Sequence, residues 1–176
     1  MGRGEGEISF LNLVNALENG TPISEVEGIS FKGGTGETVN VGLPGYQEDL
    51  DALPMPAFDL LPLHLYRSGI GTGKPLGVII TSRGCPYECT FCNRPYRSFR
   101  SSSVKRTLAE MQFFYDLGHR EFLFFDDMFN INAERVIEHA DAIKERFNDI
   151  SWTFRGRVEH VTPEMVRKSK EAGCRQ

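Results

Sequence analysis

The sequence predicts an α/β fold for its second half, because strand-like and helical segments alternate from residue 75 onward. Two short apolar segments, 76–81 and 121–125, have the character of strands, and a stretch with helical periodicity follows each of them. A third, weaker round pairs a strand-like segment, 151–155, with a helical stretch that is marked by its end signals. Those helical stretches are 103–117, 133–147 and 162–172. Because strands that alternate with helices pair in parallel through right-handed crossovers, we expect about three β/α units built on one sheet.

The helices of this half are predicted from apolar periodicity and from their end signals. The first ends at Gly118, and the third begins with Thr162 as N-cap and Pro163 in its first turn and ends at Gly173. Apolar residues recur at helical spacing in the first two helices. They are Val104, Leu108, Met111 and Tyr115 in the first and Val136, Ala140, Ile143 and Phe147 in the second.

The first 48 residues show a different pattern. Residues 8–19 predict a helix that ends at Gly20, and residues 27–32 and 38–41 predict two strands joined by a glycine-rich turn. These elements are too few for an independent core. Residues 49–74 contain three prolines and predict a linker that packs along a surface. The apolar residues of the helix at helical spacing are Phe10, Leu13, Val14 and Leu17.

Composition narrows the class of protein. The 176 residues, 40% of them hydrophobic, are enough to bury a core but fewer than the roughly 250 of a barrel enzyme. The formal net charge of the chain is −4, whereas nucleic-acid-binding domains are usually basic. We therefore expect no nucleic-acid partner. Neither a signal peptide nor an apolar run of roughly 20 residues is present. We therefore expect no membrane span and a cytoplasmic protein with reduced thiols.

Three of the four cysteines form a C-x3-C-x2-C run directly after the first predicted strand: Cys85, Cys89 and Cys92. Thiolates are the preferred ligands of iron–sulfur clusters, and a four-iron cluster with only three of them keeps one iron open. A structural zinc site or redox thiols are the alternatives, but zinc favours paired Cys or Cys/His knuckles that supply four ligands. The run therefore favours an open-site cluster.

These three cysteines, with Phe91 just before the third, resemble the signature of the radical S-adenosylmethionine (radical SAM) enzymes. The resemblance implies a 4Fe–4S cluster on Cys85, Cys89 and Cys92, whose open iron binds the amino and carboxylate groups of SAM. One electron then cleaves SAM to methionine and a 5′-deoxyadenosyl radical, which abstracts hydrogen from a small-molecule substrate. It also implies an electron donor such as flavodoxin or ferredoxin, and it places Phe91 near the adenine.

Polar residues follow the second and third predicted strands, where ligands bind in such folds. Asp126 and Asp127 come directly after the apolar second strand. By resemblance to the family, this is where the amino group of SAM is bound, and Asp126 is the stronger candidate; capping of the following helix is the alternative. Arg157 follows the third strand and is a candidate to bind a carboxylate of cofactor or substrate. A solvated surface arginine is the alternative there.

Residues 7–20, 26–31 and 49–59 resemble the segment that joins a cobalamin-binding domain to the radical barrel in one subgroup of the family. That subgroup includes anaerobic magnesium-protoporphyrin IX monomethyl ester cyclases and methyltransferases. The resemblance implies that residues 1–48 are the C-terminal remnant of a Rossmann-like cobalamin-binding domain, that 49–74 are a linker, and that 75–176 are the N-terminal half of a radical SAM barrel. Family barrels have about six strand–helix units, so we expect a fragment of a longer enzyme, with a fourth strand starting near residue 174.

The expected function is therefore that of a radical SAM enzyme, which generates the 5′-deoxyadenosyl radical or uses cobalamin for methyl transfer or cyclisation. Two alternatives stay open. A methylthiotransferase-like radical SAM enzyme would carry a different amino-terminal domain and an RNA-binding module. A noncatalytic metal-binding module would use the three thiolates for structure alone.

Overall fold

The computed structural model describes residues 1–43, 45–67, 74–93 and 97–175. The chain divides into two compact units, Met1–Glu48 and Asp49–Gln176. The second unit is built on a parallel sheet of three strands in the order β3-β6-β7. The strands are β3 (Leu76–Ile79), β6 (Glu121–Phe124) and β7 (Ser151–Phe154), and the helices are α2 (Val104–Asp116), α3 (Ala133–Arg146) and α4 (Pro163–Glu171).

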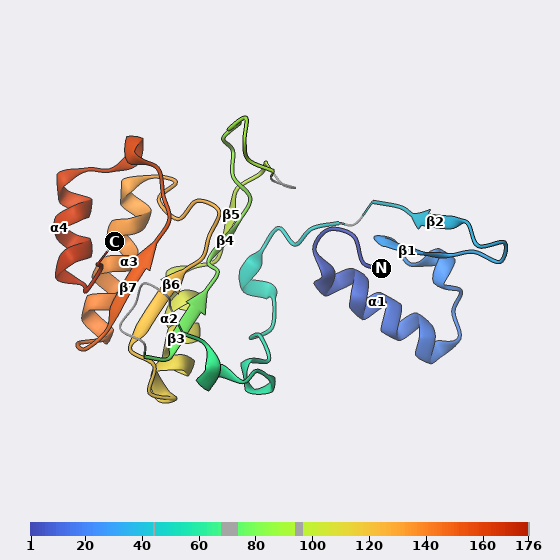
Figure 1. Ribbon diagram of the computed structural model, residues 1–176, viewed down its shortest axis with the longest axis horizontal. Helices are drawn as coiled ribbons and strands as arrows, with labels where there is room; N and C mark the ends of the chain where they lie inside the picture. Colours follow the sequence, from blue (N-terminus) through green and yellow to red (C-terminus); the bar gives the residue numbers. More distant parts are fainter. Residues whose placement is uncertain (44, 68–73, 94–96, 176) are drawn as a thin grey trace. The chain divides into compact units, whose positions relative to one another are not determined.

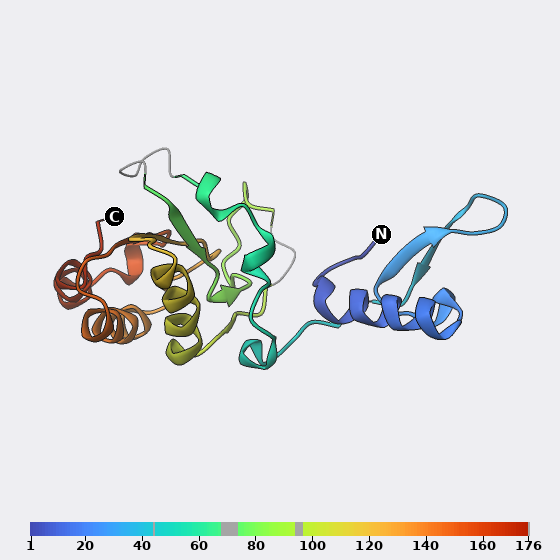
Figure 2. The ribbon, with the colours of Figure 1, turned by 90° about the horizontal axis from the view of Figure 1, so that it is seen from below.

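The strands and helices of this unit alternate along the chain, and the three helices lie on one face of the sheet (Figures 1 and 2). Each connection leads from one strand to its neighbour in the sheet. Leu76 of β3 lies opposite Glu121 of β6, and Glu121 lies opposite Ser151 of β7. The same-sided helices are the arrangement of a barrel wall. The predicted α/β fold is confirmed, and the strand and helix bounds agree with the prediction to within two residues.

Aromatic and aliphatic side chains of the sheet and the helices form one core. The predicted face of α3 is buried as expected. The predicted face of α2 holds in part: Met111 is buried, and Leu108 and Tyr115 pack against the core. The polar Thr107 and Glu110 are also buried, which apolar periodicity did not predict. The largest fully buried side chains of this core are Trp152, Phe114, Phe122, Phe124, Phe129, Ile79, Met111 and Ile143.

Side-chain caps begin all three helices of the second unit. Ser103, Asn132 and Thr162 accept hydrogen bonds from the backbone N–H three residues on, at 3.1, 2.8 and 3.2 Å. Thr162 and Pro163 therefore have the predicted roles. After α4, Gly173 has a φ of +90°, and a Cβ there would lie 2.5 Å from the carbonyl oxygen of Ile150, so only glycine fits this turn.

The last described residues run beside β7. Trp152 and Cys174 form a parallel bridge, in which the Trp152 N–H donates to the Gly173 carbonyl at 3.2 Å and the Arg175 N–H donates to the Trp152 carbonyl at 2.9 Å. After α4 the chain therefore begins to pair in parallel with the outer edge of β7, which is where the alternation of strands and helices predicts a fourth strand.

Residues 49–67, the first part of the second unit, contain three short 3₁₀ turns and pack against its helix α2. The ring of Phe58 lies 4.7 Å from that of Phe114, and Arg106 of α2 donates to the backbone carbonyls of Leu53 and Pro54. Residues 68–73 of the predicted linker lie outside the described residues. The turns are η2 (Leu50–Ala52), η3 (Phe58–Leu60) and η4 (Leu63–Leu65).

The first unit consists of α1 (Gly6–Asn19), the 3₁₀ turn η1 (Ile23–Glu25) and an antiparallel hairpin of β1 (Ile29–Lys32) and β2 (Thr38–Val41). Its core is small and centres on Ala16, Val26 and Ile29. The predicted helix and strands are present, but Phe10 and Leu17 are 67% and 66% exposed. Of the four apolar side chains that predicted α1, Leu13 alone packs against the core of this unit.

Candidate metal centre

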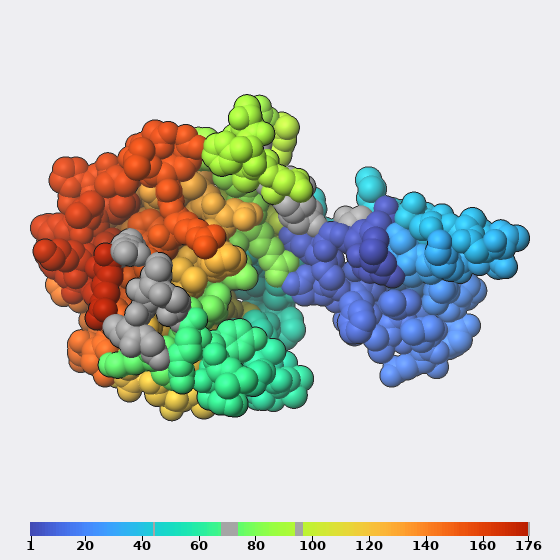
Figure 3. All heavy atoms as spheres, in the orientation of Figure 1, coloured from blue at the N-terminus to red at the C-terminus, as the bar shows by residue number. Residues whose placement is uncertain are grey.

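The cysteine-bearing loop extends from the carboxyl end of β3. Two short antiparallel strands, β4 (Ser82–Arg83) and β5 (Arg100–Ser101), pair at the base of this loop. In Figure 3 the yellow-green atoms of this loop project from the second unit, next to orange-red atoms of the segment after β7. A loop in this position lies at the end of the sheet where parallel α/β folds bind ligands.

Asp126 anchors the base of the loop. Its carboxylate accepts hydrogen bonds from the Thr81 N–H at 2.8 Å, the Ser82 hydroxyl at 2.6 Å and the Thr81 hydroxyl at 3.0 Å. Arg135 donates to the Thr81 hydroxyl at 2.7 Å, so this hydroxyl links the guanidinium of Arg135 to the carboxylate of Asp126. Burial raises the pKa of Asp126, and the hydrogen bonds from Ser82 and Thr81 oppose that rise. The network ties β6 to the start of the cysteine loop.

The three cysteines are free thiols in one loop. Cys85 and Cys89 are half-buried and Cys92 is exposed, and the Cys92 N–H donates to the Cys89 carbonyl at 3.1 Å. Cys89 and Cys92 line a hollow of about 260 Å³ together with Glu88, Asn93 and Arg97. Within the described ranges, no three His, Cys, Asp or Glu side chains already lie in metal-binding geometry. The donor set, three unpaired thiols within eight residues of sequence, is nevertheless the one that an open-site iron–sulfur cluster requires.

The segment after β7 reaches the cysteine loop. Arg157 donates a hydrogen bond from Nη1 to the Cys89 Sγ at 3.4 Å, and its Cζ lies 4.4 Å from the centre of the Tyr87 ring. The hydroxyl of Tyr87 is hydrogen-bonded to Nε2 of His160, and Arg157 forms an ion pair with Glu159. The structure thus brings the end of the third strand to the cysteines. The binding of a carboxylate by Arg157 stays a prediction.

Asn130 holds the backbone of Arg157. Its side-chain amide donates to the Arg157 carbonyl at 2.7 Å and accepts from the Arg157 N–H at 2.8 Å, and Asn130 is 1% exposed. A Cβ on Gly156 would lie 2.1 Å from Oδ1 of Asn130, so this position requires glycine. This clamp was not predicted from the sequence. The signal available in the sequence was Asn130 itself, a polar residue shortly after the buried strand β6.

The remaining predicted site residues point to solvent. Phe91 is 91% exposed, and Asp127 is exposed next to the buried Asp126. Neither is packed against the core. Both are therefore available to a ligand that approaches the carboxyl end of the sheet.

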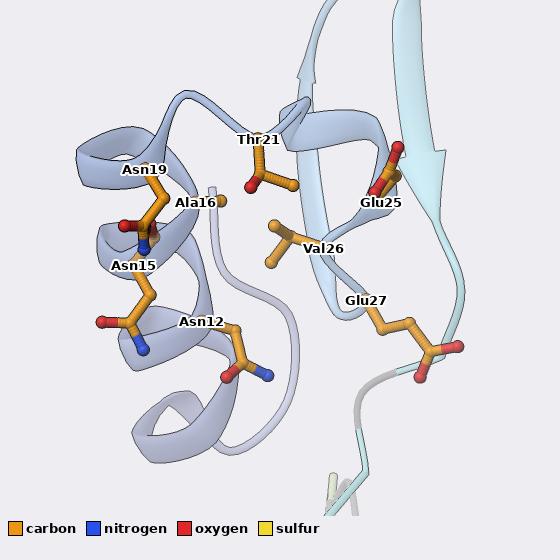
Figure 4. Close-up of a pocket in the computed structure, with 8 residues that line it drawn as sticks. All are labelled: Asn12, Asn15, Ala16, Asn19, Thr21, Glu25, Val26 and Glu27. Carbon is orange, nitrogen blue, oxygen red and sulfur yellow. Dashed lines mark hydrogen bonds between the residues drawn. The ribbon is translucent and has the colours of Figure 1, made fainter.

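A separate groove lies in the first unit, between α1 and the segment that leads into β1. Figure 4 shows its amide side chains along α1 and its carboxylates on the opposite wall. It contains no cysteine or histidine. The lining residues are Asn12, Asn15, Ala16, Asn19, Thr21, Glu25, Val26 and Glu27.

A family model described as the radical SAM superfamily matches residues 79–176. The chain belongs to the radical SAM superfamily. The matched residues include the cysteine loop and all of the strand–helix units after β3. No helix in the described part of the radical SAM chain is long and apolar enough to cross a membrane.

Curated relatives match almost the whole radical SAM chain. An uncharacterized methyltransferase of Pyrococcus horikoshii is 37% identical over 176 residues, which is 98% of this chain and 38% of the relative. The anaerobic magnesium-protoporphyrin IX monomethyl ester cyclase of Rubrivivax gelatinosus is 28% identical over 167 residues, 90% of this chain and 29% of the relative. The chain therefore spans well under half the length of these relatives.

Two solved structures share the fold. The cobalamin-dependent SAM radical enzyme OxsB, with aqua-cobalamin and SAM bound, superposes with a TM-score of 0.75 at 24% identity, over 97% of this chain and 26% of OxsB. The radical SAM methyltransferase TsrM of Kitasatospora setae, with cobalamin and a 4Fe–4S cluster bound, has a TM-score of 0.73 at 18% identity, over 99% of this chain and 36% of TsrM. The fold of this chain is thus that of a part of a radical SAM enzyme.

Proposed function

We propose that this chain is the cluster-binding part of a cobalamin-linked radical SAM enzyme that acts on a small molecule by methyl transfer or cyclisation. The observation that carries the proposal is the loop with Cys85, Cys89 and Cys92, whose thiols are free and which stands at the carboxyl end of β3. The curated relatives, a methyltransferase and a cyclase, support the reaction class. Because the chain spans a minor part of their length, substrate and outcome belong to the whole protein.

Cys85, Cys89 and Cys92 are the residues that would hold a 4Fe–4S cluster, and the loop would draw them together on binding. Such a cluster supplies an open iron for SAM and the electron that cleaves it. The chain's own part is to present three thiolates on a loop anchored at its base. Asp126 provides that anchor through Thr81 and Ser82.

The exposed residues around the loop are proposed to bind SAM. Asp127 is an exposed carboxylate beside the loop base and suits the positively charged amino group, while Asp126 fixes the backbone next to it. Phe91 offers an exposed ring for the adenine. Arg157 is the nearby cation that would face a carboxylate, although one of its N–H groups is directed to Cys89.

Residues 1–48 are proposed to be the end of a cobalamin-binding domain, 49–74 a linker and 75–176 the first half of the barrel. The division of the chain after Glu48 and the likeness to two structures with cobalamin bound support this assignment. The enzyme would take its electron from a flavodoxin or ferredoxin and work in the cytoplasm. We expect no nucleic-acid partner.

Anaerobic reconstitution with iron and sulfide tests the proposal. We expect about four irons and four sulfides per chain. Cys85→Ala, Cys89→Ala and Cys92→Ala should each lose the cluster. Cys174→Ala, which changes the cysteine outside the loop, is the matched control and should keep it. Stoichiometric zinc without iron in the wild-type chain would instead indicate a noncatalytic metal-binding module.

A further inference from the structure

Arg157 makes a direct contact with one of the three proposed cluster ligands. Its Nη1 donates a hydrogen bond to the Cys89 Sγ at 3.4 Å. Hydrogen bonds to the sulfurs and charge close to a cluster set its reduction potential. A guanidinium in this contact supplies both, because it is a permanent cation and an N–H donor.

The backbone of Arg157 is fixed by the Asn130 amide, which accepts from its N–H and donates to its carbonyl. Asn130 is fully buried, so the clamp anchors Arg157 to the core rather than to a surface loop. Gly156 lets the two segments approach, because a Cβ there would overlap the Asn130 side chain. These contacts fix the backbone of Arg157 and therefore the point from which its side chain extends.

The guanidinium is then oriented by contacts on three sides. Its Cζ lies 4.4 Å from the centre of the Tyr87 ring, and its Nη2 forms an ion pair with Glu159. The third contact is the Cys89 Sγ. An arginine held by a ring, a carboxylate and a backbone clamp reaches the sulfur in a set geometry rather than as a mobile surface charge.

We propose that Arg157 is a positioning residue that donates to the Cys89 sulfur and raises the reduction potential of the cluster bound there. The inference rests on the proposed function, because it requires that Cys89 ligates a cluster. Reduction adds negative charge, which a nearby cation and N–H donor stabilise relative to the oxidised state. Arg157 would therefore make reduction by a weak donor easier.

The test compares Arg157→Gln with the matched control Arg155→Gln in the reconstituted full chain. Arg155 lies two residues away, is exposed and has its guanidinium over the ring of Phe125 at 4.5 Å, so the control removes the same charge from the same segment. The readouts are iron and sulfide content, a thermal melt and the midpoint of a redox titration followed by electron paramagnetic resonance.

We expect Arg157→Gln to assemble the cluster and to lower its reduction equilibrium constant about tenfold, which is about 59 mV for a one-electron couple. Arg155→Gln should stay near the wild-type potential. Arg157→Lys keeps the charge without the planar fork and should shift the potential less, in the same direction.

Wild-type potential in both Arg157→Gln and Arg157→Lys, at full iron content, would overturn the inference and leave the proposed function intact. The lysine variant decides the matter if the glutamine variant fails to fold. A wild-type chain that assembles no cluster would contradict the proposed function itself, and this inference with it.

Discussion

Replacing Gly156 with alanine tests the clamp between the second and third strand ends. Gly156 has no unusual backbone angle, so alanine introduces no backbone strain, and the effect comes from the new methyl group alone. That methyl would lie 2.1 Å from Oδ1 and 2.5 Å from Cγ of Asn130. The buried amide must therefore move by about 1 Å or more to reach an ordinary contact distance.

This movement breaks both hydrogen bonds between Asn130 and the Arg157 backbone, at 2.7 and 2.8 Å. A buried polar group that loses its partner costs about 1–3 kcal/mol, and the reduced freedom of the unfolded chain with alanine returns about 0.4–1 kcal/mol. We expect Gly156→Ala to lower the free energy of unfolding by about 1–2 kcal/mol, which is the difference between these two effects. The urea midpoint should fall by about 1 M.

Urea unfolding followed by the fluorescence of Trp152 measures this effect, because Trp152 is the only tryptophan and lies buried in β7 of the second unit. The double variant Gly156→Ala with Asn130→Ala is the control. With the amide gone, the methyl should cost far less than it does in the wild-type background. An unchanged midpoint in Gly156→Ala, or additive effects in the double variant, would refute the clamp.

Three further changes test other parts of the structure. Asp126→Asn keeps the shape but places an amide against the donors of Thr81 and Ser82, so we expect a loss of about 1–3 kcal/mol in urea unfolding; an unchanged midpoint would contradict the anchor. Burial lowers the pKa of His139 from 6.5 to about 4, so the unfolded chain binds a proton that the folded chain excludes. The free energy of unfolding therefore does not depend on His139 protonation above pH 6.5. It falls, by on the order of 3 kcal/mol, as the pH drops toward 4. His139→Gln should flatten the dependence of the urea midpoint on pH in this window, and equal slopes in both proteins would count against a buried neutral imidazole. Thr162→Ala removes the N-cap of α4 and should cost about 1 kcal/mol, whereas Thr162→Ser should cost little; equal losses in both would argue against capping.

Local signals were enough to predict the elements of the second unit. The alternation of apolar strands with periodic helices predicted the sheet, and Thr162, Pro163 and Gly173 marked the ends of α4. Such features depend on neighbours within about four residues, so they are visible in the sequence itself. The position of the cysteine loop after β3 followed from the same alternation.

Contacts between distant residues were not visible in the same way. The buried face of α2 includes Glu110, which forms an ion pair with Arg106. Arg106 also donates to the carbonyls of Leu53 and Pro54, 53 and 52 residues earlier in the chain, and apolar periodicity does not register such a contact. Asp126 was predicted to bind a cofactor, but its hydrogen bonds to Thr81 and Ser82 appear only once β3 and β6 lie side by side. Its contact with SAM stays a prediction.

The clamp around Asn130 joins residues that are 27 apart in sequence, and it depends on the missing side chain of Gly156. Nothing in either local segment predicts that contact, although an asparagine after a buried strand is a signal worth following. The exposed Phe10 and Leu17 of α1 show the converse limit. Periodicity predicted a helix there, but it did not tell which of its apolar residues enter the core of this unit.

The central claim is that Cys85, Cys89 and Cys92 hold a cluster with one open iron, to which SAM binds. Electron paramagnetic resonance of the reduced, reconstituted chain, recorded before and after addition of SAM, tests it most directly. The account predicts the spectrum of a 4Fe–4S cluster that changes on addition of SAM and disappears in Cys89→Ala but not in Cys174→Ala. A cluster spectrum that is indifferent to SAM, or a chain that binds only zinc, would contradict it.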